Sequence, residues 1–139
     1  MKLTKLSEGP TRPMNDDKGI VRQLIGPDDG ARAIDVHVNV ISKEAPAFPY
    51  HFHEHAENVY VVLEGTAEAI VDGVVYRLEK DDVAFIPPGV PHAAGSAGEG
   101  PVTLLEIYAP AGKDYHRLDM PTDLRRADTG DADAPGSEG

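Results

Sequence analysis

The sequence HFHEHAENVYVVLEG occupies residues 51–65 and joins two closely spaced histidines to an apolar run. His51 and His53 are two residues apart, so on an extended strand both side chains point to the same face, roughly 7 Å from each other. The run that follows is rich in the β-branched and aromatic residues that favour strands. The segment therefore predicts a strand that presents two imidazoles to one side, a spacing that suits metal binding.

A third histidine closes a second distinctive stretch, DDVAFIPPGVPH, at residues 81–92. Its first half predicts a short strand, and its second half predicts a stiff turn. Pro88 and Pro91 restrict the backbone there, and Gly89 permits a sharp bend. The stretch therefore predicts that His92 is held in a fixed position where a strand meets a turn.

The rest of the chain is divided into short segments by frequent turn signals, such as GPDDG at 26–30 and GSAGEGP at 95–101. Short β-branched segments between such turns predict an all-β sandwich or barrel with little helix. In AIDVHVNVI, residues 33–41, apolar and polar residues alternate with a period of two, which predicts a half-buried strand. His37 and Asn39 could line the barrel or face water there; we expect them to face water, and we expect the same of Glu106 in the run VTLLEIYA.

The length and composition limit the classes of function. The chain has 139 residues, the size of one ordinary domain. Its net charge is −11 and it has no run of basic residues, which argues against nucleic acid as a partner. It has no cysteine, so a metal would need His, Asp, Glu or Asn as ligands. It has no signal peptide or long apolar run, which predicts a cytoplasmic protein without a membrane span.

The chain divides into three predicted parts. Residues 1–17 are expected to form a loose N-terminal arm, residues 18–118 the β-barrel domain, and residues 119–139 a flexible acidic tail. The arm is a candidate for pairing with a second subunit. The tail from Ala127 onward has no apolar periodicity, which predicts disorder.

The two histidine stretches together resemble the paired motifs of the cupin superfamily. HFHEHAENVYVVLEG is similar to the first motif, a His-x-His pair followed by a glutamate and a glycine. DDVAFIPPGVPHAAGS is similar to the second, with Pro87, Gly89 and His92 in register. The resemblance spans about residues 20–110. It implies a single-domain jelly-roll β-barrel that holds one divalent transition metal ion, namely Fe, Mn, Ni, Cu or Zn, on His51, His53 and His92.

The sequence departs from the family pattern at the fourth ligand. Asn58 occupies the place of the usual glutamate, and a carboxylate, Glu57, lies one residue earlier. We predict Glu57 as the fourth ligand, with Asn58 or water as the alternative, because strand alternation lets only one of the two face the metal unless a bulge intervenes. Asp81 and Ser96 also replace the usual glycine and asparagine of the second motif, and both replacements affect turn geometry more than chemistry.

A metal with three or four protein ligands keeps open positions for a substrate. The resemblance therefore implies a small metal-dependent enzyme of the dioxygenase type, acting on an enolic, aromatic or carboxylate small molecule. Two alternatives stay open, a non-catalytic module that binds a metal or small ligand and a cupin isomerase or epimerase. A homodimer is expected. The remaining histidines, His55 and His116, are expected to be exposed to solvent.

Overall fold

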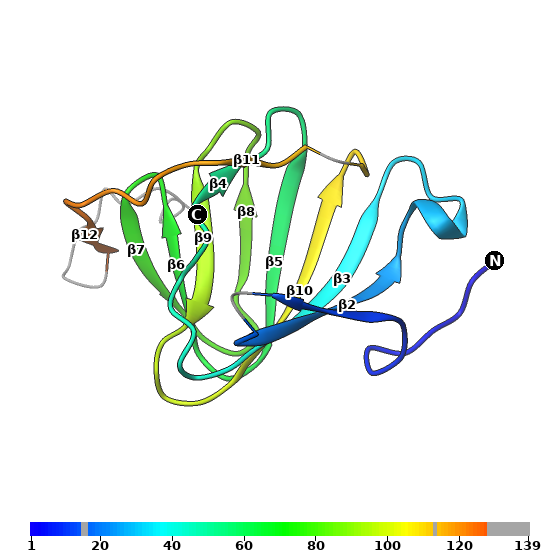
Figure 1. Cartoon of the computed structure of the whole chain (residues 1–139), viewed down its shortest axis with the longest axis horizontal. Helices are drawn as coiled ribbons and strands as arrows, with labels where there is room; N and C mark the ends of the chain where they lie inside the picture. Colours follow the sequence, from blue (N-terminus) through cyan, green and yellow to red (C-terminus); the bar gives the residue numbers. More distant parts are fainter. Residues whose placement is uncertain (15–16, 113, 128–139) are drawn as a thin grey trace.

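The computed structural model describes residues 1–14, 17–112 and 114–127, which form two facing β-sheets (Figure 1). The first sheet has the strand order β1-β2-β3-β10-β5-β8. Its strands are β1 (Thr11–Met14), β2 (Gly19–Ile25), β3 (Asp35–Ile41), β10 (Val102–Ala109), β5 (Glu57–Glu64) and β8 (Val83–Ile86). All neighbours in this sheet are antiparallel.

The second sheet has the order β11-β4-β9-β6-β7-β12. Its strands are β11 (His116–Arg117), β4 (His51–Phe52), β9 (His92–Ser96), β6 (Ala67–Val71), β7 (Val74–Leu78) and β12 (Arg125–Arg126). They are antiparallel except for β12, which runs parallel to β7. Within the described residues, one 3₁₀ turn, η1 (Pro27–Asp29), is the sole helical element, so the prediction of an all-β chain with little helix is confirmed.

The hydrophobic core comprises two clusters of buried side chains. The first is built on Ile41, Val62, Val102 and Leu104, each with no exposed surface. The second surrounds Ile70 and also receives Met120 and Leu124, which lie beyond the last long strand. Burying each such aliphatic side chain contributes roughly 1.5–3 kcal/mol. Alternation along the strands supplies these side chains and leaves their neighbours to face outward.

Two turns show how local sequence positions the strands. Asp72 and Gly73 join β6 to β7 with φ angles of 50° and 79°, as a tight hairpin requires. Asp81, at the place of a family glycine, has a φ of 74°. Aspartate tolerates this left-handed conformation better than most residues, so the replacement keeps the turn.

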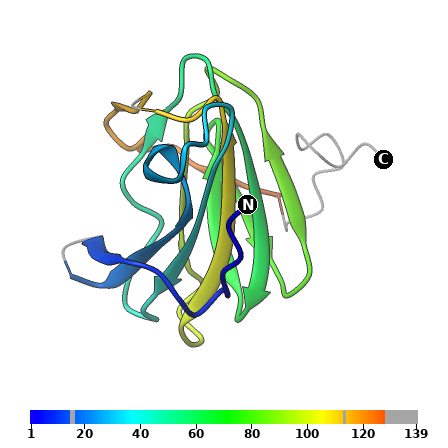
Figure 2. The ribbon, with the colours of Figure 1, turned by 90° about the vertical axis from the view of Figure 1, so that its right-hand side faces the viewer.

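The two ends of the chain pack against the sheets. Residues 11–14 of the predicted arm form β1, which pairs with β2 of the same chain (Figure 2). At the other end, β12 adds to the edge of the second sheet. Residues 128–139 of the predicted tail lie outside the described residues, so the predicted domain boundaries stay predictions. Among the described residues, no helix is long and apolar enough to cross a membrane.

Candidate metal centre

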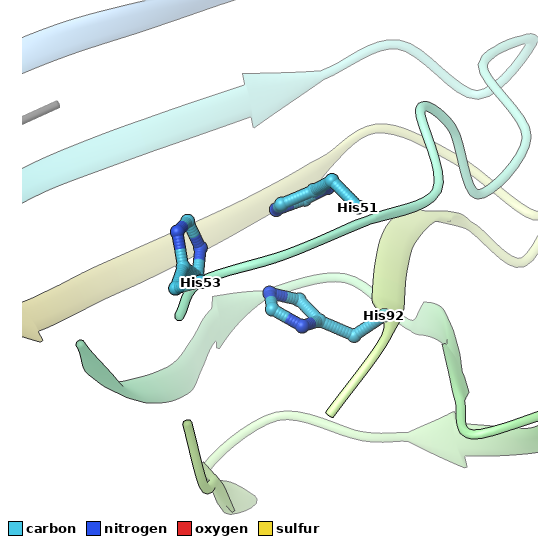
Figure 3. Close-up of side chains that lie close together, drawn as sticks. All are labelled: His51, His53 and His92. Atoms are coloured by element: carbon cyan, nitrogen blue, oxygen red, sulfur yellow. The ribbon is translucent and has the colours of Figure 1, made fainter. Parts of the chain in front are cut away.

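Three histidines from two neighbouring strands meet at one point. His51 belongs to β4 and pairs directly with His92 of β9, while His53 follows β4 by one residue. Their ligand atoms all lie within 4.8 Å of one another, and the three rings face a common point (Figure 3). His53 and His92 are 7% and 1% exposed. The structure therefore brings together the three histidines that the sequence selects.

A backbone carbonyl fixes the orientation of each ring. The Nδ1 atoms of His51 and His92 donate to Pro49 O at 2.8 Å and to Val90 O at 2.9 Å. The Nδ1 atom of His53 donates to the backbone carbonyl of Asp114. A carbonyl can only accept, so each ring carries its proton on Nδ1 and keeps a lone pair on Nε2.

The freed nitrogens are the atoms that a metal ion would satisfy. The Nε2 atoms of His53 and His92 are buried and make no hydrogen bond with any described residue. Buried polar atoms without partners are rare, because leaving one unpaired costs free energy. Three imidazoles that present lone pairs to one point suit a divalent transition metal. The residues present therefore fit the metal ion that the resemblance implies.

The environment also favours the neutral form of His51 and His92. Burial lowers the pKa of His51 to about 4, and the nearby His92 and His53 act in the same direction. Burial likewise lowers the pKa of His92. Because metal ligation requires the neutral ring, the apo site is already in the protonation state that a metal needs.

Asp114 holds the loop that follows His53, and no sequence motif identified it. Its carboxylate accepts hydrogen bonds from the backbone N–H groups of Glu54, His55 and Ala56 at 2.8, 2.7 and 3.0 Å. The same residue accepts the Nδ1 proton of His53 on its backbone carbonyl. Asp114 therefore positions both a metal-site histidine and the loop beside it. Its separation of about sixty residues from that loop leaves no local signal.

The structure does not bring the predicted fourth ligand to the site. Glu57 is exposed at the start of β5, whereas Asn58 has no exposed surface. The bulge that would have turned Glu57 inward is not present, so simple alternation puts Asn58 on the inner face. Its Nδ2 donates to Ile107 O at 3.1 Å, and its Oδ1 makes no hydrogen bond among the described residues.

The other two histidines near the site lie at its edge. The side chain of His55 is 73% exposed and that of His116 is 46% exposed, as the sequence predicts. The His116 ring stacks on Phe52 with 4.8 Å between ring centres. Neither belongs to the group of three histidines.

Two of the three histidines, His51 and His53, line a cavity of about 620 Å³. Aromatic side chains form much of its wall. Tyr115 stacks on His51 at 4.4 Å, and Tyr108 stacks on His53 at 5.7 Å. Tyr60, which is 2% exposed, packs edge-on to His92 at 6.0 Å. The cavity is large enough for a small organic molecule beside the histidines.

A second polar group lines the same cavity and corrects three expectations. His37, Asn39 and Glu106 were expected to face water, but all three point inward from β3 and β10. Alternation showed which residues share a face but could not show which face is inside. The wrong choice followed from assuming that the apolar face is the inner one. In the structure, Val36 and Val40 of the opposite face are only half-buried, although Val38 between them is 1% exposed.

Hydrogen bonds and charge connect this second group. His37 Nδ1 lies 2.9 Å from Asp35 Oδ1, and His37 Nε2 lies 3.2 Å from Glu106 Oε2. Asn39 Nδ2 also donates to Glu106 Oε2. Burial disfavours the charged form of His37, but Glu106 and Asp35 outweigh it and raise the pKa of His37 to about 9. Burial also opposes ionisation of Glu106, but His37 outweighs it and lowers the pKa of Glu106 to about 2.

Comparison with known proteins places this geometry in a family. Residues 38–108 match the model of the cupin domain. The chain belongs to the cupin family. The family resemblance drawn from the two histidine motifs is thereby confirmed. The cupin fold also agrees with the two-sheet arrangement, so the predicted jelly-roll class is confirmed.

Individual relatives support the fold of this cupin. An uncharacterized protein of Methanocaldococcus jannaschii is 26% identical over 106 residues, covering 76% of this chain and 85% of that protein. The mannose-1-phosphate guanylyltransferase of Klebsiella pneumoniae is 35% identical over 74 residues, covering 52% of this chain but 16% of that enzyme. The structure of the polyketide cyclase RemF from Streptomyces resistomycificus superposes with a TM-score of 0.71 and 23% identity, covering 88% of this chain and 89% of the cyclase.

Proposed function

We propose that this cupin binds one divalent transition metal ion through the Nε2 atoms of His51, His53 and His92 and acts on a small molecule in the adjoining cavity. One observation carries the proposal. The ligand atoms of the three rings lie within 4.8 Å of one another, and each ring is oriented by a backbone carbonyl that leaves Nε2 free. A hydrogen bond from the other ring nitrogen to a backbone carbonyl is typical of histidines that ligate metals.

Three neutral imidazoles leave coordination positions open, which is typical of catalytic rather than structural metals. When bound, the ion supplies Lewis-acid polarisation of an oxygen donor of the substrate. Imidazole ligands suit iron, manganese, nickel, copper or zinc, so the ion belongs to this group. We propose Asn58 or water, rather than Glu57, at the fourth position, because Asn58 is the inward residue of the pair. The protein would then add no negative charge to the metal through its own ligands.

We propose that the reaction is an oxygenation of an enolic, aromatic or carboxylate compound. The open coordination positions and the aromatic wall formed by Tyr60, Tyr108 and Tyr115 support this proposal. The buried pair of His37 and Glu106 favours a second candidate, a non-oxidative isomerisation or elimination, because charged side chains lie in the same cavity.

The metal proposal is tested by elemental analysis of protein purified without added metal. We expect one equivalent of transition metal in the wild type and in Glu57→Gln. A reduced content in Asn58→Ala would assign the fourth position to Asn58, and an unchanged content would assign it to water. His51→Ala should retain none, because it removes one of three ligands. Full metal content in His51→Ala, or its loss in Glu57→Gln, would contradict the assignment.

The reaction class is tested with metal-loaded protein and a panel of enolic and phenolic compounds in an oxygen electrode. Oxygen consumption by the wild type, and none by His92→Ala, is expected for an oxygenase. Product formation without oxygen would support the isomerase or elimination class instead. Ligand binding without any turnover would contradict both classes and indicate a binding module.

We also propose that the chain forms a homodimer through the outer face of the first sheet. Val83 and Phe85 of β8 are 67% and 57% exposed, and they lie beside Val61 and Val59 of β5. These four side chains are apolar on a chain with a net charge of −11, so contact through them brings no charge of their own into the interface. Light scattering after gel filtration should give a dimer for the wild type and a monomer for Phe85→Glu. A monomeric wild type would contradict the proposal.

A further inference from the structure

The cavity lined by His51 and His53 has a second, charged wall. Glu106 of β10 and His37 and Asn39 of β3 line the same cavity as these two candidate metal ligands. The side chains of His37 and Glu106 are only 8% and 13% exposed. Burying an ion pair costs free energy that its attraction rarely repays in full. A charged pair in this position therefore suggests a role beyond stability.

The geometry leaves one oxygen of Glu106 available. His37 and Asn39 both donate to Oε2, whereas Oε1 makes no hydrogen bond with the described residues. His37 in turn lies between Glu106 and Asp35, which hold its ring from both sides. His37 and Asn39 thus orient a carboxylate whose second oxygen can accept a hydrogen bond from a molecule in the cavity.

The charges of His37, Glu106 and Asp35, which contacts His37 but does not line the cavity, do not cancel. Two carboxylates, Asp35 and Glu106, face one imidazolium, His37, so the group carries one net negative charge when all three are ionised. The electrostatic influence of Glu106 extends to the candidate metal ligands, since its charge acts on both His51 and His92. An anion bound beside those histidines would therefore be repelled by Glu106.

We infer that Glu106, positioned by His37 and Asn39, determines which ligands occupy the metal centre. It favours a neutral molecule that offers a hydroxyl group, and it disfavours an anion, whose charge would be the second negative charge beside that of Glu106. An ionised carboxylate can only accept hydrogen bonds, so the group it faces must be a donor. The inference rests on the proposed metal site and deepens it. It narrows the substrate class to enolic or phenolic hydroxyl compounds and removes simple carboxylates from it.

The test uses cobalt-loaded protein, because the visible absorption of Co²⁺ changes when a ligand binds. Azide is the anionic probe and pyridine the uncharged one. We expect Glu106→Gln to bind azide roughly tenfold more tightly than the wild type does, as removal of a full charge from the same cavity predicts. Pyridine affinity should change by less than about twofold, since the probe carries no charge. Glu57→Gln, which removes an exposed carboxylate outside the cavity, should match the wild type for both probes.

Equal azide affinity in the wild type and Glu106→Gln would overturn the inference. So would an equal gain for azide and pyridine, which would indicate a wider cavity rather than a charge effect. If Glu106→Gln does not fold, Glu106→Leu removes the same charge and must show the same tighter azide binding. A wild type that gives no cobalt spectrum would refute the metal proposal itself, and the two failures are therefore distinguishable.

Discussion

Asp114 holds both the loop beside the metal centre and the ring of His53. Replacing Asp114 should therefore loosen the loop and the position of that ring. In Asp114→Ala, the backbone N–H groups of Glu54, His55 and Ala56 lose their common acceptor. The loop can then move, and the backbone carbonyl that holds His53 Nδ1 can move with it. We expect a lower free energy of unfolding and a weaker affinity for metal.

The size of the effect follows from the charge of this carboxylate. Partial burial raises the pKa of Asp114, but the three N–H groups and His116 outweigh burial and lower it from 3.8 to about 2. That difference corresponds to about 2.5 kcal/mol of unfolding free energy. The side chain is 15% exposed at the rim, and solvent screening reduces the expected loss to about 1–2 kcal/mol. Metal affinity should fall about 10–100-fold, as for other residues that orient a ligand.

Urea unfolding of the metal-free protein and competition with a chelator for Zn²⁺ measure the two effects. Asp114→Asn is the matched control, because it keeps one acceptor oxygen and should lose less than Asp114→Ala in both assays. The stabilising effect should also disappear in the wild type as the pH falls from about 3.8 to 2, because the folded-state pKa is the lower one. If Asp114→Ala matches the wild type in stability and metal affinity, the positioning role is wrong.

Further predictions follow from the same contacts. His92→Ala should abolish stoichiometric Zn²⁺ binding in equilibrium dialysis. His55→Ala should retain it, because the His55 side chain is exposed. The reverse result would contradict the assignment of these histidines within the two sequence motifs. The metal-free protein should lose stability as the pH falls from about 6.5 towards 4, because burial lowers the pKa of His51 and the unfolded chain takes up the proton first. Urea midpoints that are equal at pH 7 and pH 5 would refute this. Leu104→Ala should cost about 2–5 kcal/mol of unfolding free energy, since its side chain is fully buried; a loss below 1 kcal/mol in urea would show a looser core.

The parts of the site that sequence could predict are those encoded by local spacing. His51 and His53 share a face because they are two residues apart, and the stiff turn before His92 marks a fixed position. Their meeting point required the pairing of β4 with β9, which the family resemblance implied.

The parts that sequence could not predict depend on which side of a strand is covered. In β3 the alternation was clear, but the polar face turned inward because it lines a cavity, so His37 was expected on the wrong side. The same reasoning failed for Glu106 of β10. The register of β5 decides which of Glu57 and Asn58 faces inward, and that register is set by pairing with β8 and β10.

The central claim is that the Nε2 atoms of three particular histidines bind one metal ion. Nitrogen-15 NMR of the imidazole rings during a Zn²⁺ titration tests it most directly, because it reports which ring nitrogen of each histidine is coordinated. We predict that His51, His53 and His92 become Nε2-coordinated and Nδ1-protonated together, with saturation at one equivalent. The claim would be contradicted if these three rings did not respond, or if His37, His55 or His116 became coordinated instead.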